Sequence, residues 1–515
     1  MRRFAHPRLP RAASLLLLIA LLPGGVAAQE LEGKVRRVDL DNGMRFLLVR
    51  RGTAPVFAGT LRFRVGGADD ARGATGMAHL FEHMAFKGTS LIGTRDARAE
   101  AGILDAMDRV VRDLHRDLDR GGRGDDAARA RLQTEMEELR KRHQELVVKD
   151  ELSQVLTRNG AVGLNASTSQ DLTSYVVSLP SNRLELWCLI ESARLRDPVL
   201  REFYPERDVV MEERRTRIDS SPPGKLYEQL LLTAIQAHPY RVPTVGWMSD
   251  LERLTRPAAE AFRRTYYTPG NAVGMLVGDL DPAAAEGLVR KYFGGLAAAP
   301  PPPPVVTVEP EQKGEKRVTV EFDAEPQVMI AFHKPAWPHP DEPVFDVIDA
   351  LLTSGRTGRL FRRLVLETRV AADVFSFGAP GDRFPNLFVV GGNPRAPHTT
   401  AELESGIVAE LRRLSGEPIP EREMQKIRNQ LEADFLYPLR SNEGLAAQLS
   451  YYEILFGDWR EIVRYKQALL AVTPERVADV ARRTFVTANR TVAVLAREEP
   501  AAPAAAPAPA PGGAR

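Results

Sequence analysis

Hydrophobic and polar residues alternate near the start of the chain, as they do in strands that bury one face of a sheet. The segment RRVDLDNGMRFLLVRR at 36–51 predicts two short strands around a turn, and VFAGTLRFRVGG at 56–67 predicts a third strand. A glycine-rich loop follows, and after it a helix that carries His79 to His83. Because strands are followed by helices, we expect a mixed α/β (α+β) layer fold with helices packed on the sheet.

A helical period replaces this alternation over residues 97–157. Apolar residues recur there at steps of three and four on both sides of a break at GGRGDD: Ile103, Met107, Val111, Leu114 and Leu118, then Leu132, Met136, Leu139 and Leu146. We therefore expect an inserted helical hairpin whose arms pack as an antiparallel coiled coil. The pattern fits either a solvated strut or an arm that docks a partner.

The second half of the chain repeats the pattern of the first. Residues 263–266 and 482–485 both end a helix with Arg-Arg-Thr-aromatic, and a turn with asparagine and an apolar strand follow each of them. A one-residue gap brings the later parts of the two copies into register. We expect two duplicated mixed-sheet domains, 34–298 and 313–498, joined at 299–312 by a stiff linker with a run of five prolines.

Both ends of the chain lie outside these domains. Arginines precede the apolar run AASLLLLIALLP, and small residues at Val26 and Ala28 suit cleavage after Ala28, so 1–28 is expected to be a signal peptide. The protein is then exported, periplasmic or secreted, without stable membrane insertion; a retained anchor is the alternative. The Ala/Pro-rich tail at 499–515 is expected to be disordered.

Composition excludes some classes of function. The 515 residues are 43% hydrophobic and 27% charged, an ordinary globular balance, and suffice for two or more domains. A formal net charge of +2 and the lack of a basic stripe argue against nucleic-acid binding. The single cysteine, Cys188, lies in an apolar helical stretch, and we interpret it as a buried structural thiol.

The segment GMAHLFEHMAFKGT at 76–89 carries the candidate chemistry. His79 and His83 stand one helical turn apart, so both imidazoles can bind one metal ion. Glu82 projects near the same edge, where its carboxylate could accept a proton from water while the metal polarises a carbonyl. A surface helix with incidental histidines is the alternative, but the apolar neighbours and the cost of burying an unpaired glutamate favour a metal.

This H-x-x-E-H string resembles the signature of the pitrilysin/insulinase-type (M16) zinc metallopeptidases, the inverzincins. Further segments resemble the family over nearly the whole chain: GLNASTSQDLTSYVVSLP, FYPERDVVMEERR, YYTPGNAVGMLVGDLDP and LLTSGRTGRLFRRLV. The resemblance implies a half-length subunit with a single metal motif, two domains that form half of a clam-shell chamber, and one Zn²⁺ per chain.

The resemblance also implies a third ligand. The family carries a string like E-R-x-V-I-x-x-E, and ERDVVMEE fits it, with Glu206 first and Glu213 last. Glu213 is then the ligand, and Glu206 is a further catalytic-site carboxylate that orients a histidine or the water. Glu212 is the alternative ligand, but it points about 100° away from Glu213 around a helix. The inserted hairpin explains the long spacing after His83 and is expected near the rim of the site.

Substrate binding is expected at an edge strand. Residues 162–170, VGLNASTSQ, are small and polar, so their main-chain groups could pair with an extended peptide, with Leu164, Asn165, Ala166 and Ser167 as the candidate residues. Such pairing favours broad specificity for unfolded peptides; an ordinary solvent-capped edge strand is the alternative. The family usually has an aromatic residue where this chain has Ser167.

One departure from the family predicts a partner. The family's second half supplies an arginine and a tyrosine to the substrate, whereas this chain has Val365 and Ala372 at the matching positions. We therefore expect a heterodimer with a related M16 subunit that carries the Arg/Tyr pair; a homodimer or a monomer is the alternative. The predicted function is a zinc metalloendopeptidase for peptides or unfolded segments. Its alternatives are a processing protease with one protein substrate and a non-catalytic core or assembly subunit.

Overall fold

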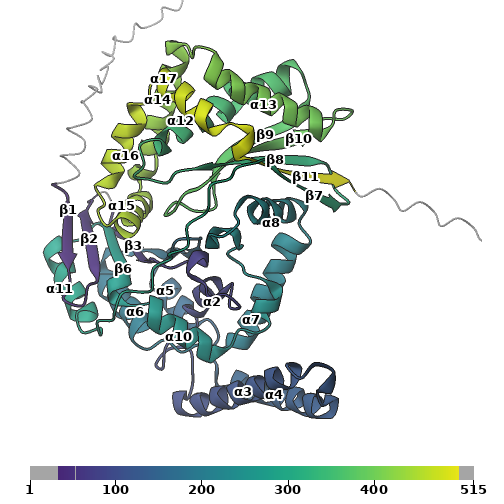
Figure 1. The fold of residues 1–515 in the computed structure, drawn as a ribbon. Coiled ribbons are helices and arrows are strands. Elements are labelled where there is room, and N and C mark those ends of the chain that lie inside the picture. The colour runs from purple at the N-terminus through teal and green to yellow at the C-terminus, as the bar shows by residue number, and fades with distance from the viewer. Residues whose placement is uncertain (1–32, 53, 498–515) are drawn as a thin grey trace, which may run out of the picture.

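The computed structural model describes residues 33–52 and 54–497, so the predicted signal peptide and the predicted tail lie outside the described residues. Two mixed sheets with their helices stack on each other, one from each half of the chain (Figure 1). This confirms the predicted mixed α/β class. No helix within 33–52 and 54–497 is long and apolar enough to cross a membrane.

The first sheet has six strands, all antiparallel to their neighbours except the parallel pair β2 and β6. In spatial order these are β1 (Val35–Asp39), β2 (Arg45–Arg50), β6 (Ala272–Gly278), β3 (Val56–Phe63), β5 (Thr173–Pro180) and β4 (Val162–Thr168). The second sheet is β7 (Lys316–Phe322), β11 (Arg490–Arg497), β8 (Gln327–Lys334), β10 (Asn386–Pro394) and β9 (Ala371–Ala379). Thus β4 is an edge strand, as predicted.

The helices fall into two groups. Those of the first half are α2 (Met77–Met84), α3 (Ala97–Leu118), α4 (Asp126–Leu146), α5 (Glu151–Arg158), α6 (Leu184–Arg196), α7 (Phe203–Arg214), α8 (Pro222–Ala234), α9 (Met248–Leu251), α10 (Arg256–Tyr266) and α11 (Pro282–Phe293). Those of the second half are α12 (Glu342–Thr353), α13 (Thr400–Gly416), α14 (Glu421–Leu436), α15 (Asn442–Phe456), α16 (Glu461–Leu470) and α17 (Pro474–Thr484).

The two sheets share one topology, which confirms the predicted duplication. In each, a parallel pair (β2–β6 or β7–β11) is followed by three antiparallel neighbours; only β1 has no counterpart. Asn271 and Asn489 make equivalent hydrogen bonds in the two halves. The side-chain amide of Asn271 donates to the carbonyl of Tyr266 at 2.8 Å, and that of Asn489 donates to the carbonyl of Thr484 at 3.1 Å. Tyr266 thus corresponds to Thr484, not to Phe485 as the sequence match had it, and the copies need no gap.

Each half lends a helix to the sheet of the other half. Leu226 and Leu230 of α8 are buried against the second sheet, and Leu445 and Leu449 of α15 are buried against the first sheet. Figure 1 shows α8 below the second sheet and α15 beside β3 and β6. This exchange fixes the two halves relative to each other. The buried Cys188 belongs to the first core, and burial raises the pKa of its thiol to about 12, consistent with a structural role.

The inserted segment forms the predicted hairpin, with α3 and α4 packed together and projecting from the body of the molecule (Figure 1). The hairpin contacts α7, where Tyr204 donates to Asp108 of α3 at 2.7 Å and Arg140 of α4 lies 3.3 Å from Asp208. At about 100° per residue, these two α7 residues lie on roughly the opposite side of the helix from Glu213. The hairpin therefore backs the predicted ligand helix, and the expected position at the rim of the site is wrong.

A buried ionic cluster ties this hairpin to the segment that follows α2. Arg201 is 1% exposed and donates to both oxygens of Glu100 at 2.9 and 3.0 Å, and also to the carbonyls of Thr89 and Ile92, each at 2.8 Å. Glu100 also lies 3.0 Å from a ring nitrogen of His143 on α4. The guanidinium group of Arg201 thus joins the α2–α3 loop to α3, and Glu100 extends the link to α4.

Replacing Arg201 with alanine is expected to lower the free energy of unfolding by about 3–5 kcal/mol, because Glu100 would be left buried without its main counter-charge. Urea denaturation measures the change. The control is Arg116→Ala, which removes an exposed pair with Asp113 and should alter stability little. An equal effect of the two substitutions would contradict the role of the cluster.

Candidate metal centre

The helix that carries the two histidines is positioned at its N-terminus. Gly76 precedes it at a φ of +85°, and an added Cβ there would lie 2.5 Å from the carbonyl oxygen of Val245. The carboxylate of Asp70 accepts the backbone N–H groups of Gly76 at 2.8 Å and Ala78 at 2.9 Å. These contacts satisfy N–H groups that the first helical turn would otherwise leave unpaired, and they fix the direction of α2.

The structure brings His79, His83 and Glu213 together. Nε2 of His79 lies 3.5 Å from Oε2 of Glu213, and Nε2 of His83 lies 3.9 Å from Oε1 of Glu213. One ligand atom from each residue lies within 4.8 Å of the others. Two imidazoles and one carboxylate that converge in this way match the donor set of a catalytic zinc site, which keeps a fourth position open.

The chemistry of these donors fits a metal ion. Burial, followed by the charges of His83 and Arg217, lowers the pKa of His79 to about 4, so its imidazole is neutral as a metal ligand must be. Oε2 of Glu213 is buried and accepts no hydrogen bond from the described residues. Burial lowers the pKa of His83, but the hydrogen bond with Glu206 and the charges of Glu213 and other carboxylates raise it more. The surroundings thus favour positive charge, which a divalent cation would supply.

The neighbouring glutamate, Glu212, does not face the histidines. Its side chain is mostly exposed and pairs with Arg215 at 3.0 Å. Glu213 instead points toward α2, and its only other charged neighbour within ion-pair distance among the described residues is Arg217, at 3.2 Å. The predicted distinction between the two glutamates therefore agrees with their placement.

Glu206 contacts the outer side of a predicted ligand. Its Oε2 lies 3.2 Å from Nδ1 of His83, and its Oε1 accepts from the ammonium group of Lys87. A carboxylate on Nδ1 sets the tautomer and orientation of the ring, so that Nε2 faces the metal position. Of the two roles expected for Glu206, the contacts match the orientation of a histidine.

Replacing Glu206 with alanine is expected to weaken zinc binding by about 10- to 100-fold, because outer partners of a ligand contribute that much to metal affinity. Competition with a chromophoric chelator measures the dissociation constant. Glu202→Ala is the matched control, since Glu202 contacts Lys87 at 3.2 Å but no histidine. Equal zinc affinity in the two variants would refute the orienting role.

Glu82 lies beside the metal position without joining the donor set. Thr168, the last residue of β4, donates its hydroxyl to Oε2 of Glu82 at 2.6 Å. Burial raises the pKa of Glu82, and this hydrogen bond and His83 lower it only in part. No donor within the described residues contacts Oε1, so this oxygen can accept a proton. Sequence reasoning missed Thr168, although it lies in the segment already assigned to the substrate strand.

The candidate substrate strand, β4, runs beside α2 and pairs only with β5. The side chains of Asn165 and Ser167 are exposed, whereas those of Leu164 and Ala166 are partly buried. The outer main-chain edge of β4 therefore faces away from the sheet next to Glu82, as substrate pairing would require.

Val365 and Ala372, the two departures from the family pattern, lie in different surroundings. Val365 is buried in the core of the second half, in the π-helical turn η8 (Phe361–Glu367), and Ala372 is exposed on the edge strand β9. Positions 365 and 372 therefore carry neither the guanidinium nor the phenol group that the resemblance implies there.

Comparisons with known proteins agree with this architecture. The family described as Peptidase M16 inactive domain matches residues 253–431, which lie beyond the candidate metal centre. The "Zinc protease PqqE" of Helicobacter pylori is 28% identical over 506 residues, which cover 96% of this chain and 100% of that protein. A crystal structure of a protease from Helicobacter pylori has a TM-score of 0.75 and 26% identity, and covers 90% of this chain and 99% of that chain.

A further structural likeness extends the comparison. The first half of the periplasmic protease PqqL from Escherichia coli has a TM-score of 0.65 at 15% identity and covers 90% of this chain and 92% of that chain. At this identity the likeness concerns the fold alone. Relatives named zinc proteases, the matched family description and the duplicated two-sheet fold together support a relationship of this chain to the M16 family.

Proposed function

We propose that this chain is a zinc-dependent metalloendopeptidase that hydrolyses peptides or unfolded protein segments. The observation that carries the proposal is the convergence of His79, His83 and Glu213 beside the carboxylate of Glu82. These three residues would hold the zinc ion, which when bound supplies Lewis acidity to polarise the scissile carbonyl and acidify water.

Other residues of the site would transfer the proton and orient a metal ligand. Glu82 would accept the proton of the attacking water at Oε1 and return it to the leaving amine nitrogen, while Thr168 holds Oε2. Glu206 would keep the ring of His83 in register with the other ligands.

The peptide substrate would add a strand beside β4, along Leu164, Asn165, Ala166 and Ser167. This proposal rests on the unpaired outer edge of β4 and on the contact of its last residue with Glu82. Because main-chain pairing reads few side chains, the specificity would be broad and would require an extended, unfolded segment.

The active assembly would be a heterodimer with a related M16 subunit that supplies an Arg/Tyr pair. The support is the buried Val365 and the small Ala372 at the positions expected for that pair. The assembly would act outside the cytoplasm, in the periplasm or as a secreted protein. The N-terminal sequence pattern supports this location, and one structural neighbour, PqqL of Escherichia coli, is a periplasmic protease.

The experiment is hydrolysis of an unfolded, unstructured polypeptide by the zinc-loaded chain, alone and co-purified with a related subunit. Cleavage products identified by mass spectrometry would appear with zinc and disappear reversibly with a chelator. A chain that binds one zinc ion but cleaves nothing in either preparation would contradict the proposal and favour a non-catalytic subunit.

A further inference from the structure

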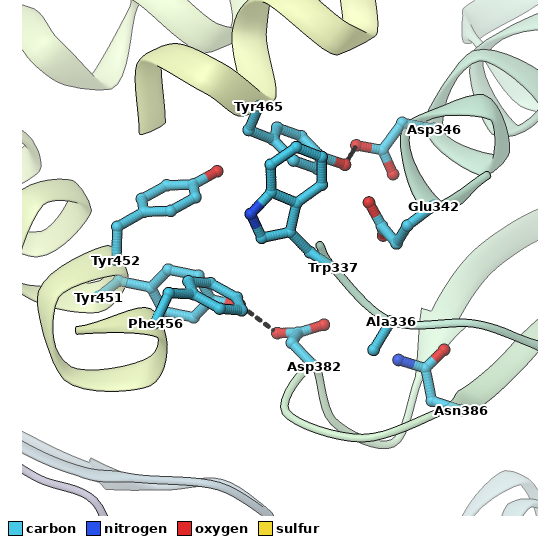
Figure 2. A pocket seen from close by; sticks show the side chains of 10 residues that line it. All are labelled: Ala336, Trp337, Glu342, Asp346, Asp382, Asn386, Tyr451, Tyr452, Phe456 and Tyr465. Atoms are coloured by element: carbon cyan, nitrogen blue, oxygen red, sulfur yellow. Dashed lines mark hydrogen bonds between the residues drawn. The ribbon is translucent and has the colours of Figure 1, made fainter. Parts of the chain in front are cut away.

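The second half of the chain contains a cavity of about 230 Å³ that shares no residue with the metal centre (Figure 2). The loop before α12, α12 itself, α15, α16 and the loop before β10 surround it. Figure 2 shows aromatic rings on one side and carboxylates on the other. This combination distinguishes the cavity from an ordinary packing defect, which would be apolar on all sides.

The aromatic side is continuous. The ring centroids of Trp337 and Tyr465 are 5.1 Å apart, those of Tyr452 and Tyr465 are 6.3 Å apart, and those of Tyr451 and Tyr452 are 5.4 Å apart. The indole N–H of Trp337 donates to Glu461 at 3.0 Å, outside the lining. The rings therefore offer mainly their π systems to an occupant, and π systems attract cations.

Two tyrosines of the lining, Tyr451 and Tyr465, already donate their hydroxyl groups to carboxylates. The hydroxyl of Tyr451 donates to Asp382 at 2.6 Å, and that of Tyr465 donates to Asp346 at 2.5 Å, as the dashed lines in Figure 2 show. Each bond orders a ring and a carboxylate together. These two hydrogen bonds thus orient four side chains of the lining.

Two acceptor atoms of the lining, in contrast, have no donor within the described residues. Oδ1 of Asn386 is buried and accepts nothing; the residue is 2% exposed, and its Nδ2 donates to the carbonyl of Gly381 at 2.5 Å. Oε2 of Glu342 is also buried and accepts nothing, although Oε1 receives Lys334 at 3.2 Å. Buried acceptors are costly to leave unmet, so an occupant that supplies N–H donors would gain from both.

The charge of the lining has the same sign throughout. Glu342, Asp346 and Asp382 line the cavity, and Lys334, which pairs with Glu342, is the cation that approaches them most closely among the described ion pairs. Arg62 lies 6.0 Å from the centroid of one lining ring but is not part of the lining. Burial and the charge of Glu342 raise the pKa of Asp346, and the charge of Lys334 lowers it only in part.

We propose that this cavity binds an organic cation with N–H donors, that is, a primary ammonium or guanidinium group carried by a free amine or by a basic residue of a polypeptide. Such a group places positive charge against the rings and carboxylates and satisfies the free oxygens of Asn386 and Glu342. A quaternary ammonium group would meet the rings but not the two oxygens. Since α15 also packs on the first sheet, an occupant stabilises the contact between the two halves.

Isothermal titration of the full chain with agmatine tests the proposal, with tetramethylammonium and 1-butanol as comparison compounds. Agmatine binds at one site, and both comparison compounds bind more weakly. Trp337→Leu and Asp346→Asn each weaken agmatine binding by about tenfold or more. The matched control is Asp323→Asn, the same chemical change at an exposed aspartate of the second half outside the lining, which leaves the affinity unchanged.

A blocked tripeptide, acetyl-Ala-Arg-Ala-amide, distinguishes the two sources of the group. It is titrated into the Glu82→Gln variant, which shares the intact cavity. Binding of the tripeptide alone assigns the group to a polypeptide, and binding of agmatine as well shows that the free amine suffices. Thermal melts verify that each variant is folded. Failure of both probes to bind, equal binding of tetramethylammonium, or unchanged affinity in folded Trp337→Leu and Asp346→Asn variants overturns the proposal.

Discussion

Replacing Glu82 with glutamine is expected to lower kcat for peptide hydrolysis by about 10²- to 10⁴-fold, the usual contribution of a general base. Glutamine has nearly the same shape and can still accept the hydroxyl of Thr168, which donates at 2.6 Å to Oε2 of Glu82. It cannot take up a proton at the second position. Steady-state kinetics on an unfolded peptide, together with metal analysis of the same samples, measures the effect.

The zinc content of the Glu82→Gln variant shows whether a loss of turnover reflects loss of the base or loss of the metal. Because Glu82 does not belong to the donor set of His79, His83 and Glu213, the variant should keep its zinc ion while losing turnover. Glu185→Gln is the control, because it makes the same chemical change at an exposed glutamate that pairs with Lys291 far from the site. Turnover that survives in zinc-loaded Glu82→Gln would exclude Glu82 as the base.

Local periodicity explains the part of the site that the sequence could predict. A four-residue step puts His79 and His83 on one face of any helix, and a seven-residue step does the same for Glu206 and Glu213. For each pair to share a face, its segment needs only to be helical, as α2 and α7 are. The duplication was predictable for a similar reason, since both copies keep their apolar strand and its turn asparagine.

Contacts between distant segments explain the part that could not be predicted. Thr168 meets Glu82 because β4 runs beside α2, and nothing in the composition of a small, polar strand indicates that neighbour. The side of α7 that carries the inserted hairpin depends on Tyr204 and Asp208, whose partners lie in the insertion itself. The exchange of α8 and α15 between the sheets likewise depends on which apolar faces meet, and amphipathic periodicity does not specify the partner of a face.

Replacing Glu213 with alanine is expected to abolish stoichiometric zinc binding, because two histidines alone would remain of a three-residue donor set. Glu212→Ala provides a closely matched control. Each substitution removes a carboxylate from α7 and breaks one ion pair with an exposed arginine, Arg217 in the first case and Arg215 in the second. Only Glu213 faces the histidines, so a difference between the variants reports the metal and not the helix or its surface charge.

Stability gives a second, independent measure of the same difference. A ligand that binds only the folded chain adds about 2.7 kcal/mol at a free concentration of one hundred times its dissociation constant. Urea unfolding with and without zinc should therefore show this gain in the wild type and in Glu212→Ala, but not in Glu213→Ala. Zinc retained in Glu213→Ala and lost in Glu212→Ala would reverse the assignment, and it would require α7 to turn by about 100° from its observed orientation, since one residue along a helix corresponds to that rotation.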